Sequence, residues 1–88
     1  MQVVILTQED CAFCEQAKAI MSRLAAEYEL EVSLLELSSP EGQTLALQGG
    51  VMFPPGIFIG GEPFSYGRPS ERALRREVER RTAAGGAS

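Results

Sequence analysis

Length, composition and charge restrict the classes of protein to which this chain can belong. At 88 residues it has room for one domain with a modest core, and a hydrophobic content of 44% argues against disorder. Its two cysteines cannot form the disulfide framework of small secreted proteins. The apolar stretch near the N-terminus, Val3–Leu6, is too short for a signal peptide or a membrane span. We therefore expect a cytoplasmic protein that binds no membrane.

The first half of the chain predicts a strand, a helix and a second strand. The aliphatic residues of Val3–Leu6 are typical of a buried strand, and a helical pattern starts at Cys11. Glu31–Leu37 resumes an extended pattern, which completes a βαβ unit with parallel strands. The predicted apolar face of the helix has five members: Ala17, Met21, Leu24, Ala25 and Tyr28.

A short second helix follows, and both of its ends carry sequence signals. Ser39 can cap the N-terminus, Pro40 suits the first helical position, and the body of the helix spans Gln43–Gln48. Gly49–Gly50 ends it.

A hairpin is predicted next. Ile57–Ile59 is a short strand, and Gly60–Glu62 forms a tight turn into a second strand, Pro63–Tyr66. Pro54 and Pro55 stand immediately before this hairpin and give it a stiff, extended entry. A cis peptide bond can precede either proline, and the residues alone do not choose between them.

The C-terminal region predicts a third helix. Ser70 can cap it, and an apolar stripe predicts that the helix runs to about Arg81. The stripe has three members: Ala73, Leu74 and Val78. Residues 1–82 are therefore expected to form the domain and residues 83–88 a flexible tail.

This third helix is also basic. Residues 68–81 hold six arginines and three glutamates, whereas the net charge of the whole chain is −4. Glu71–Arg75 and Glu77–Arg81 are spaced i, i+4, which is typical of a solvated helix face. No aromatic residue interleaves with these arginines, so we expect no nucleic-acid partner.

The two cysteines, Cys11 and Cys14, lie between the first strand and the first helix. Unpaired amides and the dipole at a helix N-terminus stabilise an anion, and the thiolate is the form of cysteine that attacks disulfides. Cys14 lies one turn further and can form a disulfide with Cys11, so the pair is predicted to be redox-active. Two other interpretations stay open: a zinc half-site, for which the chain lacks further Cys or His ligands, and two chemically idle cysteines.

Three segments resemble the glutaredoxin branch of the thioredoxin fold, and the likeness extends over about residues 2–81. Residues 11–18 resemble the stretch Cys-Pro-Tyr/Phe-Cys-x-x-Ala-Lys, and residues 55–61 are similar to cis-Pro-Thr-Val-Phe-Ile-x-Gly. Residues 64–69 resemble the Trp-Ser-Gly-Phe-Arg-Pro segment of NrdH-type redoxins. The resemblance implies an α/β fold of order β-α-β-α-β-β-α, with a four-stranded mixed sheet flanked by three helices.

The same resemblance implies a thiol–disulfide oxidoreductase that reduces protein or small-molecule disulfides. Cys11 would be the nucleophile and Cys14 the resolving thiol, with Pro55 as the cis-proline. Phe64 would lie beside the thiols. The implied site residues are Cys11 and Cys14 as catalytic groups, and Phe13, Pro54 and Pro55 as substrate-binding groups.

No bound cofactor and no metal are implied. The electron donor would be external, either glutathione or a flavin-dependent thioredoxin reductase, and the chain is expected to be a monomer. Glu9 and Asp10 stand before Cys11 where the family has a lysine, and they would repel the carboxylates of glutathione. This difference favours a protein donor.

Two other functions fit the sequence. In the first, Cys11 of two chains holds an iron–sulfur cluster in a dimeric binding module, as in some glutaredoxins. In the second, the chain is a redox-inactive interaction domain that keeps its partner when both cysteines are replaced by serine.

Overall fold

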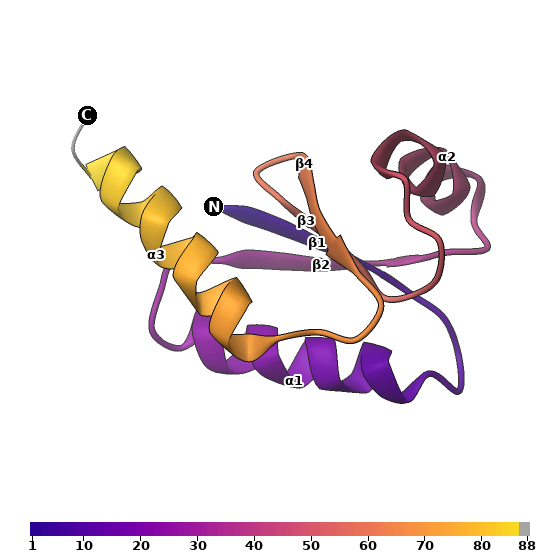
Figure 1. Ribbon diagram of the computed structural model, residues 1–88, viewed down its shortest axis with the longest axis horizontal. Helices are drawn as coiled ribbons and strands as arrows, with labels where there is room; N and C mark the ends of the chain where they lie inside the picture. Colours follow the sequence, from indigo (N-terminus) through magenta and orange to yellow (C-terminus); the bar gives the residue numbers. More distant parts are fainter. Residues whose placement is uncertain (87–88) are drawn as a thin grey trace.

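A mixed four-stranded sheet organises the chain (Figure 1). The computed structural model describes the backbone of residues 1–86 and the side chains of residues 1–83. Its elements are β1 (Gln2–Thr7), α1 (Ala12–Ala25), β2 (Glu31–Glu36), α2 (Pro40–Gly49), β3 (Gly56–Ile59), β4 (Glu62–Tyr66) and α3 (Glu71–Gly86). This order confirms the predicted α/β fold.

The strands lie in the order β2-β1-β3-β4. β1 pairs in parallel with β2, as the predicted βαβ unit requires, and antiparallel with β3, which in turn pairs antiparallel with β4. Helices α1 and α3 lie on one face of the sheet and α2 lies on the other (Figure 1). No helix within residues 1–86 has both the length and the apolarity that crossing a membrane requires.

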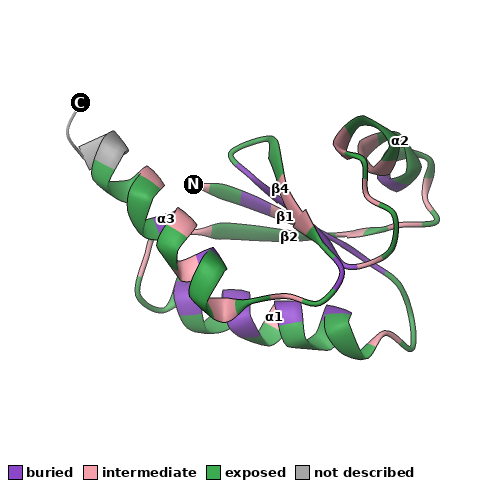
Figure 2. Cartoon of the chain, in the orientation of Figure 1, coloured by how far each residue is buried: buried purple, intermediate pink, exposed green. Residues whose placement is uncertain are grey.

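The main core lies between the sheet and the pair α1 and α3, where buried residues line β1, β3 and the inner side of α1 (Figure 2). Its fully buried members are Val3, Ile5, Ala17, Met21, Leu24, Ile57, Ile59, Leu74 and Val78, with Ile20 nearly so. Two predicted core residues, Ala25 and Ala73, are exposed instead. Tyr28 lies beyond the end of α1, packs partly buried against this core, and donates a hydrogen bond from its hydroxyl to Glu79 (2.6 Å).

Helix α2 starts at Pro40, the predicted first helical position, and so includes the residues before the predicted body Gln43–Gln48. Ser39 caps it by accepting a hydrogen bond from the N–H of Gly42 (3.0 Å), and Pro40 occupies the first turn. Gly50 ends it in the left-handed conformation, with φ of 67°. Gly42 is buried against the chain that leaves β2, where a Cβ would collide with the carbonyl oxygen of Glu36.

Helix α3 is longer than the sequence predicted. The expected cap is present, because the hydroxyl of Ser70 accepts a hydrogen bond from the N–H of Ala73 (3.2 Å). The helix continues past Arg81 to Gly86. The predicted tail, 83–88, thus begins inside α3, and residues 87–88 lie outside the described part.

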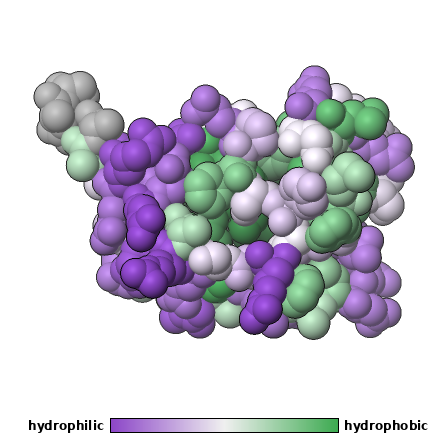
Figure 3. Space-filling view, in the orientation of Figure 1, coloured by the Kyte–Doolittle hydropathy of each residue, from purple (hydrophilic) through white to green (hydrophobic). Residues whose placement is uncertain are grey.

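Both predicted i, i+4 ion pairs form on α3, and a further pair joins the helix to the turn after α1. Within α3, Glu77 pairs with Arg81 at 2.6 Å. Arg75 joins α3 to the turn that follows α1, because both carboxylate oxygens of Glu27 accept hydrogen bonds from it, at 2.9 and 2.8 Å. Exposed pairs such as Glu27 with Arg75 each contribute about 0.2–1 kcal/mol, whereas Glu77 and Arg81 are partly buried. Hydrophilic residues gather over α3, whereas apolar residues gather over the sheet and toward α2 (Figure 3).

Candidate active site

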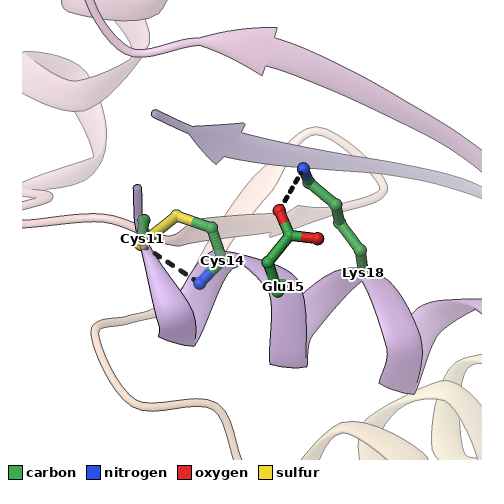
Figure 4. The surroundings of a disulfide bond; sticks show 4 residues. All are labelled: Cys11, Cys14, Glu15 and Lys18. Carbon is green, nitrogen blue, oxygen red and sulfur yellow. Dashed lines mark hydrogen bonds and ion pairs between the residues drawn. A yellow bond between two sulfur atoms is a disulfide. The ribbon is translucent and has the colours of Figure 1, made fainter. Parts of the chain in front are cut away.

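The site starts where β1 ends and α1 begins. The loop after Thr7 turns through Asp10, which has a positive φ of 54°, a conformation that Asp tolerates better than most residues. Cys11 then occupies the N-cap position of α1, and its Sγ accepts a hydrogen bond from the N–H of Cys14 (3.1 Å; Figure 4). The sulfur atom therefore takes the place that a Ser or Asp oxygen usually fills at a helix start. This confirms the predicted position of Cys11.

Cys11 and Cys14 form a disulfide, with their Cα atoms 5.2 Å apart (Figure 4). The two residues differ in exposure: Cys14 is fully buried, whereas Cys11 is partly exposed. A molecule approaching from solvent reaches Cys11 first.

The groups that favour an anion at the start of α1 belong to the helix backbone. Lys18 Nζ lies 2.8 Å from Glu15 Oε2, one turn beyond the cysteines, so its positive charge is offset locally (Figure 4). Glu9 and Asp10 are exposed on the loop that precedes Cys11. The free amides and dipole of α1 are thus the groups that favour an anionic sulfur at Cys11.

The peptide bond between Pro54 and Pro55 is cis, as the resemblance implied for Pro55. Pro55 is buried and Pro54 half-buried. Leu6 pairs with Gly56 across β1 and β3, so Pro55 lies at the same end of the sheet as the loop that leads to Cys11. The carbonyl of Pro55 accepts a hydrogen bond from the N–H of Gly67 (2.9 Å), which joins the loop after β4 to this end of the sheet.

Exposed aromatic side chains occur on three segments near this end. Phe13, expected to contact substrate, is 40% exposed on the first turn of α1. Phe53 and Tyr66 are also exposed, and their rings meet edge to face with centroids 5.2 Å apart. The sequence reasoning missed this pair, although its members directly precede Pro54 and Gly67. Phe64, which was expected beside the thiols, packs partly buried against the main core.

Within the described residues, no three side chains among His, Cys, Asp and Glu are grouped so that they could hold a metal ion. A zinc site in this part of one chain would therefore lack ligands beyond the two sulfurs. An iron–sulfur cluster shared by two chains stays an untested alternative.

The comparisons with known proteins agree with this geometry. The model of the family described as thioredoxin domain matches residues 1–79. The chain belongs to the thioredoxin-domain family. It is 26% identical over 81 residues to a thioredoxin of Methanocaldococcus jannaschii, covering 92% of this chain and 95% of that relative.

Two solved structures share the fold. Thioredoxin 1 of Thermosipho africanus superposes with a TM-score of 0.73 at 14% identity, covering 98% of this chain and 99% of the other. A mutant thioredoxin of Halobacterium salinarum gives a TM-score of 0.68 at 24% identity, covering 90% of this chain and 72% of the other.

The family and the bonded Cys-x-x-Cys pair together make this thioredoxin-domain protein a thiol–disulfide oxidoreductase. The glutaredoxin-like and NrdH-type subtype stays a prediction, because the family match is to the broader thioredoxin domain.

Proposed function

We propose that this protein reduces disulfides in protein substrates through attack by Cys11 and resolution by Cys14. The Cys11 thiolate attacks a substrate disulfide and releases one substrate thiolate, which takes up a proton. Cys14 then loses its proton and attacks Cys11 Sγ in the mixed disulfide, releasing the second substrate thiolate. The protein dithiol becomes the Cys11–Cys14 disulfide, and the substrate gains two electrons and two protons.

The observation that carries this assignment of roles is the unequal exposure of two bonded sulfurs at a helix N-terminus. Cys11 is reachable from solvent and its sulfur accepts an N–H from the first turn of α1, which favours the thiolate. Cys14 is fully buried, so it reacts only with a sulfur that is already attached to Cys11.

Apolar surface beside the cysteines supports a protein substrate. Phe13, Pro54 and Pro55 remain the proposed contacts, and the exposed Phe53–Tyr66 pair extends this surface. Pro54 has no N–H, so its backbone can accept a hydrogen bond from a bound chain but cannot donate one. Side-chain contacts with these aromatic rings would then supply much of the recognition.

The proposed electron donor is a flavin-dependent thioredoxin reductase. Glutathione carries two carboxylates, and the exposed Glu9 and Asp10 next to Cys11 repel them. A protein donor can place its own charges to suit these residues.

A turnover assay tests both proposals. The purified protein is given a disulfide substrate and NADPH, once with glutathione and glutathione reductase and once with thioredoxin reductase. We expect NADPH consumption with thioredoxin reductase, and its loss in Cys11→Ser and Cys14→Ser. Activity that survives in Cys11→Ser would contradict the role of Cys11. Turnover with glutathione alone would contradict the donor, and a Cys11–Cys14 pair that cannot be cycled in a redox buffer would contradict the function as a whole.

A further inference from the structure

The hydroxyl of Thr7 stands out because it forms no hydrogen bond with any described protein group. Thr7 is 6% exposed, and its Oγ1 is the one buried side-chain oxygen or nitrogen without a hydrogen-bond partner among the residues that the structure describes. The carbonyl of the same residue is satisfied by the N–H of Leu37 (2.8 Å). A buried hydroxyl without a partner costs free energy, so its presence calls for an explanation.

The strand register places Thr7 on the sheet face toward α1, at the end of the sheet where the redox pair lies. Val3 and Ile5 point toward α1 and pack in the same cluster as Ala17, and Thr7 follows them on the same face of β1. Leu6 pairs with Gly56, so extending the ladder by one residue brings Thr7 opposite Pro55. Thr7 therefore lies at the end of the sheet next to the start of α1, the helix whose first turn carries the buried Cys14.

Cys14 needs different surroundings in its two redox states. In the disulfide its sulfur has no proton to donate and no charge. After reduction it is a buried thiol that must become a thiolate to attack Cys11, and burial disfavours the charged form. A hydroxyl can accept a hydrogen bond from a thiol or donate one to a thiolate.

We propose that Thr7 is a positioning residue for Cys14: its hydroxyl, unpartnered in the disulfide form, donates a hydrogen bond to Cys14 Sγ once the pair is reduced. This inference rests on the proposed function. In the resolving step the Cys14 thiolate attacks Cys11 Sγ, the substrate thiolate leaves, and the proton given up by Cys14 is taken up by that leaving thiolate. The Thr7 hydroxyl keeps its own proton throughout.

The two redox states should therefore respond differently to loss of this hydroxyl. Thr7→Val keeps the shape of the side chain and removes the oxygen. We expect the oxidised protein to resist urea as well as wild type or better, and the reduced protein to unfold at lower urea. The reduction potential of the pair, measured in a glutathione redox buffer, should move to a more negative value because the reduced form loses a contact.

Kinetics and titration provide two further measurements. Decay of the mixed disulfide on Cys11 should slow about tenfold in Thr7→Val, and the pH midpoint of Cys14 thiolate formation should rise by about one unit, as expected for loss of one hydrogen bond to a charged group. Thr7→Ser retains a hydroxyl and should stay close to wild type in all these measurements. Thr7→Ala is a second variant without the oxygen, should the valine disturb packing.

The outcomes separate this inference from the proposed function. Equal destabilisation of both redox forms, with an unchanged potential and thiolate midpoint, would make Thr7 a packing residue and overturn the inference. Cys11-dependent turnover in the same variants would still support the proposed function. Turnover that is as fast in Cys11→Ser as in wild type would instead overturn the function itself.

Discussion

Replacing Gly67 with alanine would show whether the loop after β4 shapes the surface beside the cysteines. Gly67 has φ of 79°, a region that costs an L-residue about 1–2 kcal/mol. An added Cβ would lie 2.6 Å from Cε2 of Phe53, so this exposed ring must shift, and we expect it to lose its contact with Tyr66. Loss of their edge-to-face contact adds about 0.5–1.5 kcal/mol. We expect Gly67→Ala to lower the free energy of unfolding by about 1.5–3.5 kcal/mol.

Gly61→Ala is a matched control for this variant. Gly61 has nearly the same φ, 82°, but no atom lies within 4 Å of its would-be Cβ. It should lose only the conformational part, about 1–2 kcal/mol, in urea unfolding followed by circular dichroism.

Turnover is the second measurement for these two variants. Gly67→Ala should reduce a protein disulfide more slowly than wild type while a small-molecule disulfide is reduced normally, and Gly61→Ala should reduce both normally. Identical stability and turnover in the two variants would refute the link between Gly67 and the aromatic surface.

Three further predictions concern stability and can be checked by urea unfolding. Gly42→Ala should cost about 1–3 kcal/mol, because its Cβ meets the rigid backbone of Glu36; a neutral result would mean that the β2–α2 connection yields easily. Hydrogen bonds from two arginines lower the pKa of the Glu77 carboxyl from 4.5 to about 2. Glu77→Gln should thus be less stable than wild type by about 1 kcal/mol above pH 4.5, and this difference should vanish as the pH falls through about 2. Equal stability of the two proteins at all pH values would mean that the ion pairs of Glu77 contribute nothing. Leu74 lies in the core, so Leu74→Ala should lower the free energy of unfolding by about 2–5 kcal/mol. Leu47 is 85% exposed, so Leu47→Ala should change it by less than about 0.5 kcal/mol. Similar losses in the two variants would contradict the assigned core.

Much of the fold was predictable because local signals agreed with tertiary contacts. The apolar run after Gln2, the Ser39 cap and the two glycines of the hairpin each fix one element through backbone chemistry that acts within a few residues. The same holds for Cys11 at the start of α1. Where the prediction was wrong, as for the exposed Ala25, helical spacing indicated a face but not how far the neighbouring elements cover it.

The rest of the site depends on contacts between segments far apart in the chain. The edge contact of Phe53 with Tyr66 and the bond from Gly67 to Pro55 arise only when β3 and β4 pair. The isolation of the Thr7 hydroxyl likewise depends on what α1 and the sheet place around it. Periodicity and motif spacing describe neighbours along the chain, so they hold no information about such contacts.

The difference in burial between the two cysteines has a practical consequence for finding the partners of this protein. In Cys14→Ser, a substrate joined to Cys11 would have no second sulfur within the chain to release it. Each target would remain covalently attached and could be isolated from cell extract under denaturing conditions, then freed by a reductant and identified by mass spectrometry. The variant would thus serve as bait for the physiological substrates of the wild-type protein.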